Sequence, residues 1–477
     1  IVPVSLFAWA PYSLLRSSTS PEISTMMTFA ALASGQANYY LSLASDASGY
    51  YVDLKGLEPA GRWYGPAAAE FNLSGVVEAD ALKRLCEGVD PHDPEKRLVR
   101  NAETPKRKHG DDLCFSAPKS VSLAWALASP ELRDAIQAAM HRAVEDALDY
   151  IQETCGFARV GAQGQRLERV PLMFALFEHA SSRAGDAQLH VHCVCPNVTK
   201  HEGGRTTAFD STYIYHHMMA GGAIFRASLA EGIRRLGLPI ERDGSCFRIR
   251  GFSEKLCEAA STRREEIIAA ILETSKKLGR LEGLDEKQLL KAASGRMAEI
   301  VNLETRRAKR ELSRADIFEN TRELARSLGL GENYIEGLIT RQRVLSPEEK
   351  LAVKEEVFQA SMERLTDNYS HWNKLNMTRV LAEESQGKGL DATDARELVE
   401  AKIAGRELVN IGEVVTDRRN DAANSWRERT EERFTTQDIL DLEAELLSAV
   451  ESLSRKPAGV NPHVARGVIE LTREKLA

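Results

Sequence analysis

The sequence has 477 residues, 43% of them hydrophobic, and a formal net charge of −7. This length allows about two to four domains with apolar cores of ordinary size. The acidic balance excludes a uniformly basic nucleic-acid coat, so any DNA contact has to come from local basic patches. Seven cysteines without regular spacing favour a reducing compartment over a disulfide framework, and no apolar run is long enough to span a membrane.

Residues 1–25 start with the apolar run IVPVSLFAWAPYSLL, which lacks the basic leader and the initial methionine of a signal peptide. We interpret these residues as an extension outside the fold. The first domain is therefore expected to begin at Met26 or Met27.

Two tyrosine pairs follow, Tyr39-Tyr40 and Tyr50-Tyr51. Tyrosines at such positions commonly just cover a core with their rings. A phenol with a pKa of about 10 is a poor nucleophile at neutral pH. Next to a metal-bound phosphate and a base, however, it can attack phosphorus and form a phosphotyrosine ester. The tyrosines alone do not decide between the two interpretations.

The stretch KRKHGDDLCFSAPKSVSL contains the one dense basic cluster of the N-terminal half, formed by Lys106, Arg107 and Lys108. Such a run is usually a solvated loop, but beside a phosphodiester it can position backbone phosphates. Asp112 follows at the start of an apolar segment, where an isolated aspartate most simply caps a turn.

A long helix is predicted between Ser129 and Gly156. Ser129 suits the N-cap and Pro130 the first helical position, and Gly156 suits the end. One face of this helix is apolar, with Leu132, Ile136, Met140, Ala143, Ala147 and Ile151. We expect it to pack on the back of a sheet.

The segments LMFALFEH and QLHVHCVC, joined by ASSRAGDA, predict a β-hairpin with a longer loop. Because side chains alternate along a strand, His190 and His192 point to one face and Cys193 and Cys195 to the other. If His179 pairs opposite His190, His192 lies diagonally from His179, at Cβ separations of about 5 and 7–8 Å. Three imidazoles then converge on a site for a divalent metal with open positions for a substrate.

These segments resemble known motifs when they are taken together. The tyrosine pairs, GRWYG, DDLCFSAPKSVSL and FEH…QLHVHCVCPNVT are similar to the motifs of MobF-type conjugative relaxases, which are HUH endonucleases. Cys114 replaces the threonine that is commoner in this family. The resemblance implies that Asp112 lies beside the histidines, where it accepts a hydrogen bond from a ligand imidazole or serves as general base.

The resemblance also implies roles for the tyrosines. Tyr39 corresponds to the first nucleophile and Tyr50 to the second, and Tyr40 and Tyr51 are reserves because adjacent tyrosines can point in different directions. The basic cluster defined above would contact DNA phosphates.

The expected fold class is α+β, with an antiparallel HUH sheet flanked by helices and a mostly α-helical C-terminal region. The expected divisions are 1–25 outside the fold, 26–252 as the relaxase core, 253–330 as finger-like helices, and 331–477 as a helical region. In the family, this last region leads to a helicase motor. The sequence contains no G-x-x-x-x-G-K-[ST] phosphate loop, so we expect the chain to stop before that motor.

The function implied is a metal-dependent, strand-specific endonuclease and strand transferase that nicks single-stranded DNA at an origin of transfer. Tyr39 would attack phosphorus, the 3′-hydroxyl would leave, and the protein would stay attached to the 5′ end. Mg²⁺ or Mn²⁺ is expected at the histidines, and Zn²⁺, Ni²⁺ or Co²⁺ also suits them. The family resemblance further implies accessory relaxosome proteins, a type IV secretion coupling protein, and a bacterial cytoplasmic location with transfer into a recipient cell.

Three alternatives stay open at this point. A rolling-circle replication initiator would use the same residues at a different origin, although the long helical tail argues against it. A metal-stabilised single-stranded DNA-binding module without catalysis would keep its function in a Tyr39→Phe variant. A scaffold would carry its activity in residues 253–477 alone.

Overall fold

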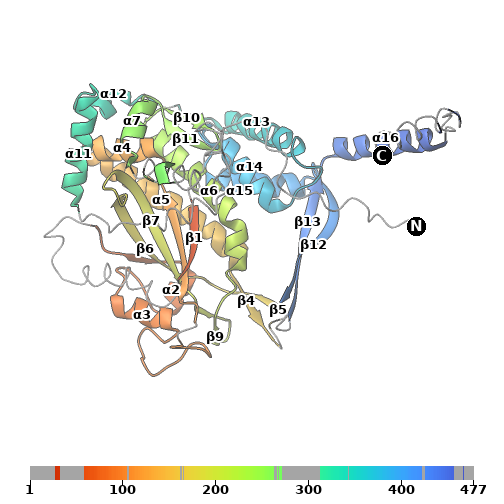
Figure 1. Cartoon of the computed structure of the whole chain (residues 1–477), viewed down its shortest axis with the longest axis horizontal. Helices are drawn as coiled ribbons and strands as arrows, with labels where there is room; N and C mark the ends of the chain where they lie inside the picture. The colour runs from red at the N-terminus through yellow and green to blue at the C-terminus, as the bar shows by residue number, and fades with distance from the viewer. Residues whose placement is uncertain are drawn as a thin grey trace.

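A computed structural model describes most of the chain. Figure 1 shows its helices and strands, coloured from red at the N-terminus to blue at the C-terminus. The described residues are 27–32, 58–104, 107–161, 166–262, 312–341, 343–421 and 425–455, with a few single residues between and beyond these ranges. Both tyrosine pairs and Lys106 lie outside the described residues.

The centre of the fold is a five-stranded sheet in which every neighbouring pair is antiparallel. Across the sheet the strands are β1 Met27–Leu32, β3 Gly110–Ser116, β7 Ala187–Pro196, β6 Phe174–Ser181 and β2 Arg62–Tyr64. The predicted hairpin thus forms β6 and β7 near the middle of the sheet. This sheet and its covering helices confirm the α+β class expected from the sequence.

One face of the sheet is covered by three helices, α4 Lys119–Leu127, α5 Pro130–Cys155 and α6 Thr212–Arg235. Helix α5 begins as predicted, because the Ser129 hydroxyl accepts the Leu132 amide and Pro130 is the first helical residue. Its apolar positions join Val191 and Cys193 of β7 in one buried cluster. The predicted packing of this helix on the sheet is confirmed.

The other face is covered over part of its area by two short helices, α2 Pro66–Glu70 and α3 Ala79–Glu87. Leu82 and Leu85 of α3 pack with Phe177 of β6 and Val194 of β7 in a second, smaller core. The rest of β6 and β7 on this face carries the three predicted histidines.

Smaller hairpins and one short helix surround the central sheet. They are β4 Phe157–Val160 with β5 Arg166–Arg169, β8 Thr199–Lys200 with β9 Thr206–Thr207, β10 Ile240–Asp243 with β11 Cys246–Ile249, and α7 Glu254–Ala259.

Helices from the C-terminal half complete the main core. They are α11 Arg314–Ser327, α12 Tyr334–Leu338, α13 Pro347–Thr366, α14 Lys374–Ser385 and α15 Ala392–Ala404. Ile317, Ile335, Ala382 and Ala395 belong to the same buried cluster as the helix face of the sheet, and α14 packs on α6. The packing of the main core therefore continues well past residue 252.

A long hairpin departs from the helical region expected at 331–477. It consists of β12 Val409–Asp421 and β13 Ser425–Thr435, and it precedes helix α16 Gln437–Arg455, which projects away from the body in Figure 1. Ile411 and Val414 of this hairpin are exposed. Strand positions that face solvent, such as these two, do not need alternating polarity, so the usual sequence signal of a strand is weak here.

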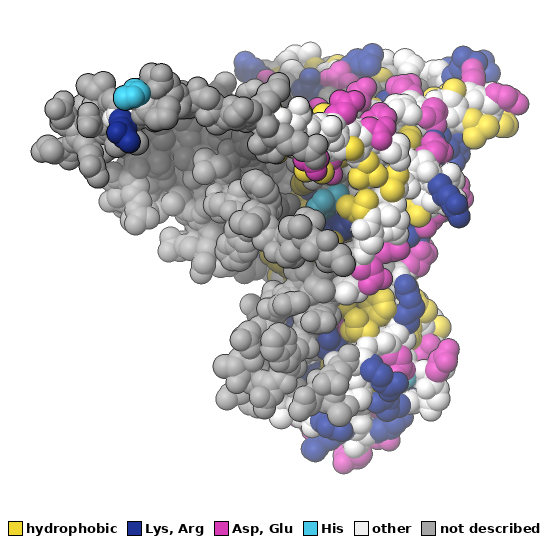
Figure 2. Space-filling model, turned by 90° about the vertical axis from the view of Figure 1, so that its right-hand side faces the viewer, with side chains coloured by type: hydrophobic (Ala, Val, Ile, Leu, Met, Phe, Trp, Pro, Cys, Tyr) yellow, Lys and Arg dark blue, Asp and Glu magenta, His cyan; other side chains and the backbone are white. Residues whose placement is uncertain are grey.

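On the face drawn in Figure 2, the described acidic and basic side chains are interspersed. Within the described part of the chain, no helix combines the length and the hydropathy that crossing a bilayer requires.

Candidate metal centre

Three imidazoles meet on the face of the sheet opposite α5. His179 pairs directly with His190, and His192 pairs with Phe177, so His192 lies diagonally from His179. One ligand nitrogen from each ring lies within 4.8 Å of the other two, and the ring centroids are 5.1 to 5.3 Å apart. The register predicted from the sequence is confirmed, and the donor nitrogens are close enough to share one ion.

The remaining ring nitrogens of two of these histidines are held by the protein. His190 Nδ1 lies 2.8 Å from the carbonyl oxygen of Gln188, and His192 Nδ1 lies 2.9 and 3.0 Å from the carboxylate oxygens of Asp112. These oxygens can only accept, so each Nδ1 donates and each Nε2 is the ring nitrogen left to bind a metal. Metal-ligating histidines are commonly oriented by a backbone carbonyl or a carboxylate in this way, so the donor set fits a divalent ion.

Asp112 reaches His192 from the neighbouring strand β3. It pairs with Val194, and Cys114 pairs directly with His192, so all of them face the same side as the histidines. Burial alone would lower the pKa of His192, but Cys114 and Asp112 raise this pKa well above its ordinary value. A metal ion that binds Nε2 at neutral pH would therefore displace a proton.

The cysteines of the hairpin take no part in this cluster. Cys193 and Cys195 are buried on the helix face, and burial raises the pKa of both thiols well above the ordinary value. Their exclusion from the metal site, predicted from the alternation of side chains, is confirmed. Within the described ranges, no other group of three or more His, Cys, Asp or Glu side chains meets the same spacing.

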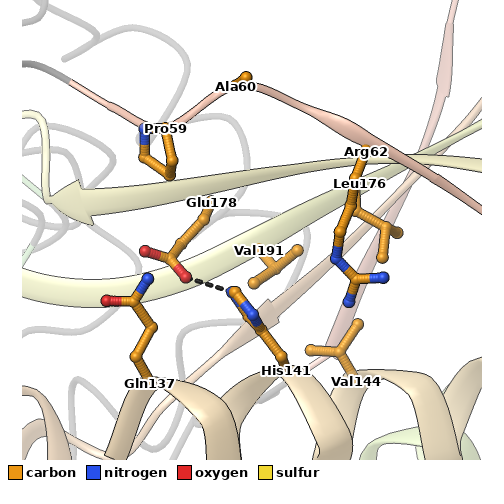
Figure 3. A pocket seen from close by; sticks show the side chains of 9 residues that line it. All are labelled: Pro59, Ala60, Arg62, Gln137, His141, Val144, Leu176, Glu178 and Val191. Carbon is orange, nitrogen blue, oxygen red and sulfur yellow. Dashed lines mark hydrogen bonds and ion pairs between the residues drawn. The ribbon is translucent and has the colours of Figure 1, made fainter. Parts of the chain in front are cut away.

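Behind the histidines, on the helix face, lies a small pocket that sequence reasoning missed. Figure 3 shows Glu178 of β6 pointing to His141 of α5, with which it forms an ion pair, beside Gln137 and Arg62. Burial alone would raise the pKa of Glu178, but His141 and Arg314 hold it below its usual value. Glu178 immediately precedes His179 in β6. The metal cluster on one face of the sheet and the buried ion pairs on the other face are therefore linked through consecutive residues of one strand.

Arg107 and Lys108, the two described members of the predicted basic cluster, lie in a different environment from the solvated loop expected. Arg107 is buried, and its guanidinium donates to the carbonyl oxygens of Cys86 and Asn197, at 3.1 and 2.7 Å. Lys108 forms an ion pair with Asp111 at 2.5 Å. These contacts argue against Arg107 as a phosphate ligand, because its donors already stabilise the turn region around it. A run of basic residues in a sequence does not reveal such burial.

The comparisons with known proteins agree with this geometry. Residues 33–328, more than half of the chain, match the family model of the TrwC relaxase. The chain belongs to the TrwC relaxase family. This membership confirms the relaxase resemblance found in the sequence motifs.

Relatives of this relaxase family include the multifunctional conjugation protein TraI of Escherichia coli K12. TraI is 33% identical over 215 residues, which are 42% of this chain and 12% of TraI. The chain thus matches only a small part of the length of that relative.

Two solved relaxase structures match over 64% of this chain and 99% of the solved chain. One is the conjugative relaxase TrwC in complex with oriT DNA in a metal-bound form, with 28% identity and a TM-score of 0.54. The other is TrwC complexed with a 27-mer DNA comprising the recognition hairpin and the cleavage site, with 27% identity and a TM-score of 0.52.

Proposed function

We propose that this chain is a conjugative relaxase, a metal-dependent endonuclease and strand transferase that nicks one strand of DNA at an origin of transfer. The observation that carries the proposal is the cluster of His179, His190 and His192, with Asp112 bonded to His192, in a chain of the TrwC relaxase family. The solved TrwC structure with oriT DNA supports the same substrate for this chain.

The three histidines would hold the metal ion through nitrogen donors. When bound, a divalent ion supplies positive charge beside the non-bridging oxygens of the scissile phosphate. We propose Mg²⁺ or Mn²⁺ as the working metal, while an all-nitrogen donor set also suits Zn²⁺, Ni²⁺ or Co²⁺. Both Asp112 oxygens lie within hydrogen-bond distance of His192 Nδ1, which supports an orienting role for Asp112 over a role as general base.

Tyr39 is our proposed nucleophile, and Tyr50 is the proposed second one, with Tyr40 and Tyr51 as alternatives. In the first step a bond forms between the phenol oxygen and phosphorus, and the bond from phosphorus to the 3′ oxygen breaks. The phenol gives its proton to a base, and the leaving 3′ oxygen takes one up. One phosphodiester replaces another, so the step is nearly neutral in free energy and reversible: in the reverse direction a 3′-hydroxyl attacks phosphorus and the bond from phosphorus to the phenol oxygen breaks. A second tyrosine would let the same site perform the closing transfer.

The same proposal covers the setting of the reaction. We propose residues 26–252 as the relaxase core and 253–330 as helices that contact the strand, with Lys106 and Lys108 near DNA phosphates. We further propose a bacterial cytoplasmic location, accessory relaxosome proteins, a secretion coupling protein, and transfer into a recipient cell.

A covalent-adduct assay tests the proposal. The protein is mixed with a pooled library of single-stranded oligonucleotides and Mg²⁺ or Mn²⁺, and adducts that survive boiling in detergent are isolated. We expect a 5′-phosphotyrosine adduct that disappears with EDTA and in the Tyr39→Phe variant. Tyr64→Phe is a matched control, because the Tyr64 hydroxyl is bonded to Asp149 at 2.8 Å on the helix face. Tight binding of strands without any adduct would instead favour a binding module without catalysis.

A further inference from the structure

The edge of the sheet beside His179 is closed by a side chain instead of a strand. In the β2 and β6 pair, Arg62 lies opposite Leu176, so the same register would place position 58 opposite Ala180. Strand β2 begins at Arg62, so its ladder with β6 does not extend to this position. The Glu58 carboxylate accepts the Ala180 N–H instead, at 3.0 and 3.2 Å. Glu58 therefore holds the strand at the residue directly after a proposed metal ligand.

The same stretch of β6 is irregular in its pairing. His179 pairs with His190, but Ser181 pairs with Ala187, so β7 has one more residue than β6 in this interval. Such a shift bends a strand and weakens its ladder locally. The hydrogen bond from the Ala180 N–H to Glu58, on the side of β6 away from β7, would limit movement of the strand at this weakened point.

Glu58 is held by an arginine from a distant part of the chain. Arg314, the first residue of α11, lies 3.3 Å from a Glu58 oxygen and 2.5 Å from Glu178. Its guanidinium also lies 3.4 Å from the Gln137 side-chain oxygen and over the ring of Trp125. The side chains of Glu58, Arg314 and Glu178 are 13%, 19% and 4% exposed, so solvent screens these ion pairs only weakly.

Arg314 thus contacts two carboxylates on either side of His179 along β6. One belongs to Glu178, and the other belongs to Glu58, which accepts the N–H of residue 180. Without the guanidinium, Glu58 and Glu178 would be two partly desolvated negative charges held near each other, and each would have lost one neutralising ion pair. Glu58 would then be expected to turn towards solvent and release the Ala180 N–H.

We propose that Arg314 and Glu58 form a brace that positions His179 for metal binding, with Arg314 acting through Glu58 and Glu178. The role of this brace in catalysis rests on the proposed relaxase function. It joins three segments that are far apart in the sequence: the chain just after the tyrosine pairs, the strand that carries His179, and helix α11. Neither Arg314 nor Glu58 is a metal ligand, so both are positioning residues.

The test measures metal binding by the full chain, without DNA. Co²⁺ alone is titrated and the visible absorption of the Co²⁺ complex is recorded for Arg314→Met, Glu58→Ala and Glu58→Gln. Arg159→Met is the matched control, because Arg159 lies on β4, outside the central sheet, and forms a similarly buried ion pair with Asp210. Urea unfolding of every variant shows whether the fold is intact.

We expect Arg314→Met and Glu58→Ala each to weaken Co²⁺ binding about 10- to 100-fold. A loss of this size is common when a residue that positions a metal ligand is removed. Glu58→Gln keeps an oxygen for the Ala180 N–H, so its affinity should stay within about threefold of the original. The double variant should be no weaker than either single one, because both changes break the same brace.

Unchanged Co²⁺ affinity and an unchanged absorption spectrum in a folded Glu58→Ala variant would overturn the proposal. An equal loss in Arg159→Met would overturn it as well, since the effect would then be general destabilisation. If Arg314→Met does not fold, the two Glu58 variants still decide the outcome. The titration contains no DNA, so it tests the brace separately from the proposed function, which would be refuted if the original protein failed to form an adduct.

Discussion

The two faces of the central sheet differ sharply in chemistry although they come from the same strands. In β7, His190 and His192 face the metal cluster, whereas Val191 and Cys193, their direct neighbours, are buried against the helices. The metal face presents nitrogen donors at the edge of a small core, and the helix face presents mostly close-packed apolar groups, with the ion pairs of Glu178 and Asp111 among them. Alternate residues of one strand therefore serve different purposes: the histidines can bind a metal, and the residues between them stabilise the fold.

Strand β3 repeats the same division with two adjacent aspartates. Asp112 accepts a hydrogen bond from His192 on the metal face, while Asp111 is fully buried on the other face and paired with Lys108. Identical side chains one residue apart thus have unrelated effects. Substitutions in such neighbouring pairs separate the contribution of each face.

The largest difference is expected between His192→Ala and Val191→Ala. Removing a residue that only hydrogen-bonds to a metal ligand commonly weakens metal binding 10- to 100-fold. His192→Ala removes a ligand itself, so it should weaken Co²⁺ binding about a thousandfold, or by about 4 kcal/mol. Val191→Ala should keep the Co²⁺ affinity within about threefold but lower the free energy of unfolding by about 1–3 kcal/mol. Co²⁺ titration and urea unfolding measure both quantities, and a reversed pattern would contradict the division between faces.

The next effect concerns the pH dependence of stability at Asp111. Burial raises the pKa of Asp111 to about 6, although Lys108 partly offsets this. The folded state then holds a proton that the unfolded state has already released between about pH 4 and 6, so stability falls as the pH rises through this window. The decrease from this group is at most about 3 kcal/mol.

Asp111→Asn should remove this contribution. Urea unfolding of the original protein and the variant, measured at intervals from pH 4 to 7, gives the difference between the two curves. A difference that does not change with pH in this window would contradict the assignment to Asp111.

Asp112→Asn should have a smaller effect, of a different kind. An amide at this position can present its oxygen to His192 Nδ1, but it lacks the negative charge that favours the ligand orientation. We expect Co²⁺ affinity to fall about 10- to 100-fold, with adduct formation falling in parallel. If the adduct rate falls while Co²⁺ affinity stays constant, Asp112 acts as the general base instead.

The smallest effect is expected from Cys114→Thr on the metal face. Cys114 lies opposite His192, and threonine is the commoner residue of the family motif at this position. Both side chains are small and both can donate and accept a hydrogen bond, the thiol more weakly than the hydroxyl, so the rate of adduct formation should change by less than about threefold. A loss comparable to that of Asp112→Asn would assign Cys114 a direct part in the site.

Much of this site could be predicted from the sequence because a single physical pattern fixes it. The two-residue period of a strand placed His190 and His192 on one face, and the loop before Ala187 brought His179 opposite His190. The flanking helix was equally readable from Ser129, Pro130 and its apolar spacing. Asp112 was recognised through a family motif, since an isolated aspartate carries no such signal.

The remainder depends on contacts between distant segments, which no local pattern encodes. Arg314 reaches Glu58 and Glu178 across more than a hundred residues, and Arg107 is buried although its neighbours in the sequence are basic. The β12 and β13 hairpin is not predicted from the sequence, because exposed strand positions such as Ile411 and Val414 give no alternation of apolar and polar residues. Sequence periodicity reports burial, and where burial is small or non-local it gives no information.

The pairing of β6 and β7 also limits how this gene can change in length. Inserting or deleting one codon between Leu189 and Cys193 would rotate every later side chain of the strand, turning a ligand histidine into the core and a cysteine towards the metal. Affinity and folding would be lost in a single event. Natural length variation in this hairpin should therefore be confined to the loop between Ser181 and Ala187, where added residues leave the register of the histidines intact.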